Sequence, residues 1–167
     1  LPRLVESKDI KGDLHTHTNY TWVSSHDAGT HSMAEIVNQA IALGYEYIGI
    51  GDHNPSLTSY SPTQIITEIK RRSEEIEHLK SSRTINILKT LEVDIRTSGE
   101  LAVSDDGLAL LDLAIVSVHS SMCMDKTDMT KRVLSGLAHP KAKILGHPTG
   151  RLLGSREGYE LDWDQVF

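Results

Sequence analysis

The residues of this sequence best suited to chemistry are its histidines, of which there are nine in 167 residues. Histidine is the side chain that most often binds metals or transfers protons near neutral pH. Six candidate metal ligands fall where short apolar runs end: His15, His17, His53, Glu92, His119 and His147. His15 and His17 are two positions apart, so in an extended chain both side chains project from one face and can hold one ion together. Agreement at every run end favours a metal site over isolated hydrogen-bonding histidines.

This set of ligands predicts more than one transition-metal ion. Imidazole suits Zn, Fe, Ni and Cu, and a carboxylate among the ligands keeps Mn and Fe among the candidates. Glu92 is the expected bridge, because a carboxylate can hold two cations about 3.5–4 Å apart, the separation that suits phosphoryl transfer. Metal-bound water has its pKa lowered toward about 7, which would supply hydroxide without a dedicated protein base.

The candidate ligands need a scaffold that brings several strand ends together. Short apolar runs alternate with longer amphipathic segments, which is the pattern of βα units and a parallel sheet. We expect strands at 10–15, 45–51, 85–93, 111–118 and 142–145, helices at 32–43, 62–80 and 127–138, and a further helix beginning near residue 162. In parallel α/β proteins ligands collect at the carboxyl ends of the strands, so the six candidates are expected to converge.

Composition limits the class of protein. The chain has 17 Lys and Arg against 23 Asp and Glu, a net charge of −6, and 38% apolar residues, which is typical of one globular domain. The lone Cys123 excludes an internal disulfide and any structural zinc site with two thiolates from this chain. No apolar run approaches the ~20 residues that span a bilayer, and the first residues lack a signal-peptide stretch, so we expect a cytoplasmic protein with no membrane partner.

Five motifs occur in order along the chain: DLHTH (13–17), GDH (51–53), LEVDI (91–95), SVHS (117–120) and GHP (146–148). Together they resemble the PHP (polymerase and histidinol phosphatase) superfamily. More narrowly, LPRLVESKDIKGDLHTHT, LDLAIVSVHS, TKRVL and GHPTGRLLG are similar to the PHP domain at the carboxyl end of bacterial and archaeal family X DNA polymerases. The likeness covers essentially the whole chain, so we expect 1–167 to be a single PHP domain, with 1–9 as the linker from an upstream polymerase region.

The resemblance implies a distorted (β/α)7 TIM-like barrel whose trinuclear site uses Zn, Mn or Fe to hydrolyse phosphate esters. It implies one ion on His15, His17 and Glu92, a second on Glu92, His119 and His147, and a third on His53. Glu92 would also be catalytic, as would Asp52, which would support the ligands from behind. For a family X polymerase the resemblance implies 3′–5′ exonuclease and 3′-end processing activity on DNA, with metal-activated hydroxide as the nucleophile.

The segment after the first histidine pair departs from the family pattern. The sequence TNYTWVSSHDAGTH (18–31) is longer than the short family motif that helps to bind the third ion. Either His26 or Asp27 could fill that position. We prefer His26, and His31 is the third choice.

The family's last metal motif, Asp-x-His, has no match after His147. Asp162 and Asp164 flank Trp163 in a predicted helix and are poor substitutes. The barrel is therefore expected to be truncated before its last strands, with a weakly bound third ion.

Phosphate binding requires positive charge close to the ions. Candidates on segments that follow ligand-bearing strands are Lys126, Lys131, Arg132, Arg151 and Arg156. Arg151 is assigned a catalytic role because its planar guanidinium suits a pair of phosphate oxygens, whereas Lys131 and Arg132 are expected on the exposed face of a helix. Tyr20 and Trp22 could stack on a nucleobase or pack over the barrel mouth.

The leading hypothesis is therefore a metal-dependent phosphoesterase with two to three ions that acts on DNA 3′ ends. One rival is a small-molecule phosphatase of the histidinol-phosphatase type, which the same ions could serve. The other is a catalytically degenerate PHP module with a structural or regulatory role.

Overall fold

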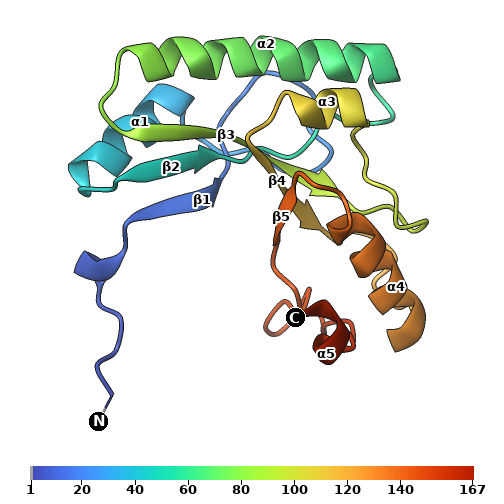
Figure 1. The fold of residues 1–167 in the computed structure, drawn as a ribbon. Helices are drawn as coiled ribbons and strands as arrows, with labels where there is room; N and C mark the ends of the chain where they lie inside the picture. Colours follow the sequence, from blue (N-terminus) through green and yellow to red (C-terminus); the bar gives the residue numbers. More distant parts are fainter. Residues whose placement is uncertain (1) are drawn as a thin grey trace.

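The computed structural model describes residues 2–167 and contains one five-stranded parallel sheet (Figure 1). The strands are β1 (Gly12–Thr16), β2 (Tyr47–Ile50), β3 (Asn86–Asp94), β4 (Leu113–Ser117) and β5 (Ala142–Leu145), and they lie in this same order in the sheet. The helices are η1 (Ser7–Asp9), α1 (Met33–Ala42), α2 (Pro62–Ser81), α3 (Asp105–Ala109), α4 (Lys126–Leu137) and α5 (Trp163–Val166).

The strands curl into a half-barrel with helices on its outer side (Figure 1). Helix α1 contacts β2, α2 contacts β3, and α4 contacts β5. The predicted α/β fold of a truncated TIM-like barrel is therefore confirmed. Each expected strand is present within a few residues of its predicted bounds, and the short helix α3 is an addition.

Two of the helices begin at residues that the sequence identifies. Ser32 and Glu35 form a reciprocal capping box at the start of α1, and Ser61 with Gln64 does the same for α2, whose first residue is Pro62. These side chains satisfy backbone N–H groups that a helix start leaves unpaired. The caps fix where the two helices leave the loops that follow β1 and β2.

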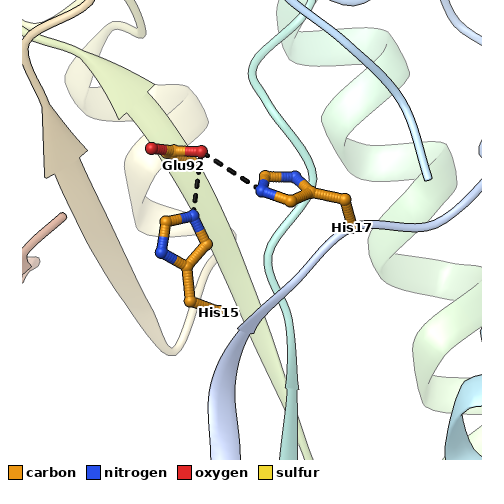
Figure 2. Close-up of side chains that lie close together, drawn as sticks. All are labelled: His15, His17 and Glu92. Carbon is orange, nitrogen blue, oxygen red and sulfur yellow. Dashed lines mark ion pairs between the residues drawn. The ribbon is translucent and has the colours of Figure 1, made fainter. Parts of the chain in front are cut away.

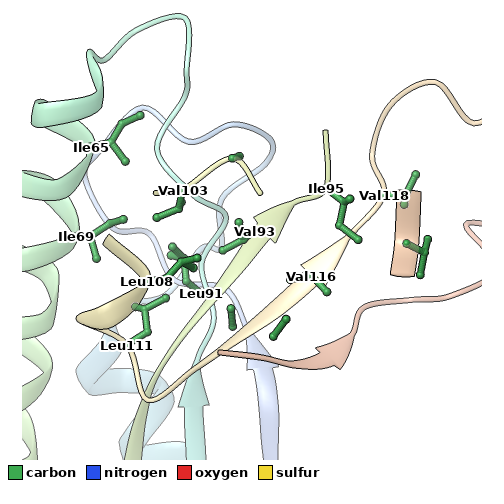
Figure 3. Close-up of a cluster of buried hydrophobic side chains, with 14 of the residues drawn as sticks. Ile65, Ile69, Leu91, Val93, Ile95, Val103, Leu108, Leu111, Val116 and Val118 are labelled. Carbon is green, nitrogen blue, oxygen red and sulfur yellow. The ribbon is translucent and has the colours of Figure 1, made fainter. Parts of the chain in front are cut away.

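The larger hydrophobic core lies between the sheet and helices α2, α3 and α4 (Figure 3). Leu91 and Val93 of β3 are fully buried in it beside Ile69 of α2 and Leu108 of α3. Since side chains alternate across a strand, Glu92 between them points to the opposite, inner face. The core thus fixes the strand that carries the candidate bridging carboxylate.

A second, smaller core packs α1 and α2 against β2 and the start of β3, and it includes Val37, Ile48, Ile50, Ile76 and Ile87. The backbones of β1 and β2 approach each other closely at Gly49. A Cβ atom on Gly49 would lie 2.7 Å from the carbonyl oxygen of Leu14. Only glycine allows this approach.

Among residues 2–167, no helix has the length and apolar character that a membrane span requires.

Candidate metal centre

All five strands deliver a candidate ligand to the same end of the sheet. His15 lies in β1 with His17 directly after it, Glu92 lies near the end of β3, and His119 and His147 each follow their strand by two residues. His53 follows β2 and forms an isolated parallel bridge with Glu92. The candidate ligands from all five strands therefore lie at one edge of the sheet, as predicted.

Glu92 lies at the centre of the histidines and its side chain is 1% exposed. Its Oε2 lies 2.8 Å from Nε2 of His15, 3.4 Å from Nε2 of His17 (Figure 2) and 3.2 Å from Nδ1 of His53. Its Oε1 lies 2.7 Å from Nε2 of His147 and 3.3 Å from Nε2 of His119. We call these six residues the Glu92 cluster. One buried carboxylate is thus shared by five imidazoles, the arrangement expected of a bridging ligand.

The ligand atoms form several groups that could each hold an ion. His15, His17 and Glu92 make one, His53, Glu92 and His119 a second, and His26, Asp94 and His119 a third, with all atoms of a group within 4.8 Å of one another. Nε2 of His119 also lies 3.2 Å from Nε2 of His147, so these two rings and Oε1 of Glu92 make a further set. The groups share Glu92 and His119, so two or three ions placed here would be neighbours.

The histidine nitrogens themselves fit a metal better than a hydrogen-bonded network. Among residues 2–167, Nδ1 of His17 is buried without a hydrogen-bond partner. Nε2 of His15 and Nδ1 of His53 are also buried, and although they lie close to Oε2 of Glu92 they form no hydrogen bond of good geometry with it. Buried polar atoms without partners are rare in native proteins and call for an explanation. Two of them, in His15 and His53, face the Glu92 carboxylate, where a divalent cation would bind both the nitrogen and the oxygen.

Burial and charge set the protonation of the cluster. Burial lowers the pKa of His53 to about 4, so its ring is neutral at pH 7, the form that binds metals. Burial also disfavours the charged form of His119, but hydrogen bonds to Asp94 and Glu92 outweigh it and raise the pKa to about 9. Burial alone would raise the pKa of Glu92, yet hydrogen bonds from His119 and His147 hold it well below its usual range. Glu92 is therefore a carboxylate at neutral pH.

The local backbone near His147 is unusual. His147 has φ of 39°, a left-handed conformation that is uncommon for residues other than glycine and is often found at functional sites. At the preceding Gly146, a Cβ would collide with Oγ of Ser117. The turn after β5 therefore holds the His147 ring toward Glu92 at some local cost.

The loop 18–31 brings two of its three candidates to the cluster. Nε2 of His26 lies 3.0 Å from Oδ1 of Asp94, and its ring centroid is 4.2 Å from that of His119. Oδ1 of Asp27 lies 3.2 Å from Nε2 of His53, although the Asp27 side chain is 84% exposed. His26 and Asp27 thus both reach the centre.

The third candidate of this loop lies elsewhere. Nδ1 of His31 is 3.0 Å from Oγ1 of Thr30, and His31 lines a separate hollow with Glu35 and Gln39. At the other end of the chain, Asp162 accepts a hydrogen bond from Gln165 within the α5 turn. None of the groups found among residues 2–167 that could hold an ion includes His31, Asp162 or Asp164.

Asp94 is a member of the site that the sequence analysis missed. Its Oδ1 lies 2.6 Å from Nδ1 of His119, so Asp94 can accept a hydrogen bond from a proton on that nitrogen. Nε2 of the same ring then faces Glu92 and His147. Carboxylates commonly orient metal-binding histidines in this way. The available signal was spacing, because Glu92 and Asp94 are two positions apart on one strand, as are His15 and His17.

We predict that Asp94→Asn weakens metal binding by about 10- to 100-fold, the usual cost of losing such an outer partner. The amide fills the same space but cannot hold the Nδ1 proton of His119 as a carboxylate does. Titration with Co²⁺, followed by absorbance and calorimetry, measures the effect. Asp106→Asn on the exposed side of α3 is the matched control, and equal affinities in the two variants would contradict the prediction.

Asp52 lies behind the centre. Its Oδ1 accepts a hydrogen bond from the backbone N–H of Thr18 at 2.5 Å, and its Oδ2 pairs with Arg72. Its hydrogen bonds and ion pairs thus join it to Thr18 and Arg72, and it supports the segments that carry His17 and His53.

The basic candidates separate into exposed and buried residues. Arg151 and Arg156 line a hollow of about 230 Å³ together with His147, and Nε of Arg156 donates to the carbonyl oxygen of Gly150. Lys131 is exposed, as expected, and pairs with Asp128. Arg132 corrects the prediction of an exposed face, since it is 2% exposed and donates to the carbonyl oxygens of Ile95 and Ser120.

The two aromatic candidates for base stacking pack into the protein. Trp22 is 7% exposed and belongs to the larger core. Tyr20 meets Trp22 edge to face, with ring centroids 4.9 Å apart, and is partly buried against both cores. Trp22 is therefore a core residue and does not offer its ring to a nucleobase.

Comparison with known proteins places the chain in context. The family model described as "PHP domain" matches residues 13–165. The chain is 38% identical over 164 residues to the Bacillus subtilis (strain 168) protein named DNA polymerase/3'-5' exonuclease PolX, covering 98% of this chain and 28% of that protein. It is 30% identical over 159 residues to a probable phosphatase of Thermoanaerobacter sp. (strain X514) and 29% identical over 158 residues to one of Clostridium acetobutylicum, covering 92% of this chain and 58% and 57% of those proteins. The chain thus spans between about a quarter and three-fifths of the length of these relatives.

Proposed function

We propose a function on the premise that the chain belongs to the PHP domain family. The chain is, in this proposal, a metal-dependent phosphoesterase whose ions are held around Glu92. The observation that carries the proposal is the contact of both Glu92 oxygens with five histidines from the ends of four other strands. A structural ion pair does not require five imidazoles around one carboxylate, whereas a cluster of cations uses imidazole and carboxylate groups as ligands.

In this proposal the cluster holds two to three ions of Zn, Mn or Fe. His15 and His17 with Glu92 would hold one, and His119 and His147 with Glu92 another. His53 and His26 offer ligands for a third, beside Asp94. Such ions neutralise charge on phosphate oxygens and lower the pKa of water toward neutrality.

The chain's own residues then have separate tasks. Glu92 supplies negative charge that keeps the cations close together, and Asp94 holds the Nδ1 proton of His119. Arg151 and Arg156 stand beside the exposed edge of His147, where guanidinium groups could bind the oxygens of an incoming phosphate. Asp52 keeps the backbone next to His17 and His53 in place.

We propose DNA 3′ ends as the substrate and 3′–5′ exonuclease or 3′-end processing as the activity. Support comes from the likeness to the Bacillus subtilis protein, whose name includes both a DNA polymerase and a 3'-5' exonuclease. By the same likeness, residues 1–9 would link the domain to an upstream polymerase region in a cytoplasmic protein.

The test is hydrolysis by the purified 167-residue chain in Mn²⁺ or Zn²⁺. We expect it to release nucleotides, or a 3′ phosphate, from single-stranded DNA. The double variant His15→Ala, His17→Ala is expected to lose more than about 100-fold in rate, because removing two direct ligands should exceed the loss of an outer partner. His31→Ala with His78→Ala removes two histidines outside the cluster and should leave the rate unchanged. Full activity in the His15→Ala, His17→Ala variant would show that the proposed centre is not the catalytic one.

A small-molecule phosphatase is the second candidate, and it is favoured by the likeness to relatives named probable phosphatases. Comparing turnover of a sugar or amino-alcohol phosphate with turnover of single-stranded DNA separates the two. Elemental analysis addresses the degenerate module, since fewer than about one transition-metal ion per chain would favour a domain without catalysis.

A further inference from the structure

Helix α2 carries a charged side chain that solvent does not reach. Arg72 is 0% exposed, and its guanidinium lies 5.5 Å from the centre of the Trp22 ring. Burying a guanidinium is costly unless its N–H groups have partners. The partners of Arg72 therefore define what this residue does.

The partners of Arg72 come from two neighbouring strands, from the end of β2 and from the middle of β3. Nε and Nη2 of Arg72 lie 2.9 and 2.8 Å from Oδ2 of Asp52. Nη1 donates to the carbonyl oxygen of Thr90 at 3.1 Å, and Nη2 donates to that of Ile50 at 2.6 Å. Because both nitrogens take one oxygen of Asp52, the other oxygen is free to accept the backbone N–H of Thr18.

Asp52 and Thr90, and Thr18 through Asp52, lie close in sequence to members of the Glu92 cluster. The pairs are Thr18 beside His17, Asp52 beside His53, and Thr90 two positions before Glu92 on the same face of β3. A single guanidinium thus fixes the spacing between three chain segments that each deliver a ligand. A lysine could not do so, because its ammonium lacks the planar fork.

We infer that Arg72 is a positioning residue for the metal centre: through Asp52 and two strand carbonyls it holds His17, His53 and Glu92 at the spacing that binds ions. The inference rests on the proposed function. Arg72 touches no member of the Glu92 cluster, so it acts through the backbone and through Asp52.

The test compares metal affinity with thermal stability in variants of the full chain. Arg72→Met should lower the affinity for Co²⁺ or Mn²⁺ by about 10- to 100-fold, as loss of an outer support does, and Arg72→Lys should fall between Arg72→Met and wild type. Ile76→Ala is the matched control, because Ile76 is also 0% exposed on α2 but belongs to the smaller apolar core. Ile76→Ala should lower the melting temperature and keep wild-type affinity. Wild-type affinity in Arg72→Met would overturn the inference.

A double variant separates positioning from simple stability. Breaking a buried ion pair is strongly destabilising, whereas replacing both partners by apolar residues can be neutral. Arg72→Met with Asp52→Leu should therefore regain melting temperature relative to Arg72→Met, yet stay weak in metal binding. Recovery of both properties would mean that Arg72 contributes stability alone.

Hydrogen exchange in the ion-free protein gives a readout that does not depend on metal. The Thr18 amide should be protected in wild type and in Ile76→Ala, and should exchange faster in Arg72→Met and in the double variant. If the wild-type chain binds no ion, the proposed function fails while this comparison still decides the role of Arg72. Equal protection in all four proteins would overturn the inference.

Discussion

Glu92→Gln is expected to abolish tight metal binding, with affinity falling by more than about 100-fold, the upper end of what loss of an outer partner costs. Both Glu92 oxygens contact histidines, Oε2 toward His15 and Oε1 toward His147. Glutamine preserves the size of the side chain but removes the charge that keeps cations together. Its NH₂ group would also point a donor at histidine nitrogens or at an ion. Hydrolysis of phosphate esters should therefore be lost with the metal.

Elemental analysis and calorimetric titration measure this loss directly. Thermal unfolding shows whether the Glu92→Gln variant remains folded, which keeps a folding defect apart from a binding defect. Glu100→Gln is the matched control, because Glu100 carries a side chain that is 73% exposed and lies outside the Glu92 cluster. If Glu92→Gln binds as many ions as wild type with similar affinity, Glu92 is not a bridging ligand.

The elements that the sequence predicted well are those with strong local signals. Helices α1 and α2 begin within one residue of their predicted starts at 32 and 62, because a capping box is a contact between residues only three positions apart. Strand β4 was predictable from its nearly continuous apolar run, because a strand that is buried on both faces has such a run. The ligands at the strand ends were predictable for the same reason, since a parallel sheet brings all its carboxyl ends to one edge.

Helix α3 was missed because its local signals are weak. It is five residues long and contains Gly107, a poor helix former. Its stability comes from packing: Leu108 is buried in the larger core, and a Cβ at Gly107 would lie 2.6 Å from Val103. Tertiary contacts of this kind leave no periodic pattern in the sequence.

The buried arginines were missed for a different reason. Arg72 and Arg132 lie on amphipathic helices, where an arginine normally belongs to the exposed face. Both donate to backbone carbonyl oxygens, Arg72 to that of Ile50 at the end of β2 and Arg132 to that of Ile95 just after β3. The partners are backbone atoms, which every residue has, so no side-chain pattern marks them.

Leu91→Ala is expected to destabilise the fold by about 3–5 kcal/mol, because it removes a fully buried leucine and leaves a cavity. Leu91 is 0% exposed in the larger core, packed with Ile69 and Leu108. For a chain of this size, such a loss corresponds to a fall in melting temperature of roughly 6–20 °C. Thermal and urea unfolding measure the change.

Leu153→Ala makes the same chemical change at a side chain that is 78% exposed, and its effect should stay within about 0.5 kcal/mol. Because side chains alternate on β3, Leu91 packs against the helices while its neighbour Glu92 points to the histidines. Leu91→Ala should therefore lose stability but keep metal affinity in its folded fraction, whereas Glu92→Gln should lose affinity. A Leu91→Ala protein as stable as Leu153→Ala would contradict the packing of β3 against α2 and α3. A folded Leu91→Ala protein without metal affinity would mean that the outer core also sets the geometry of the Glu92 cluster.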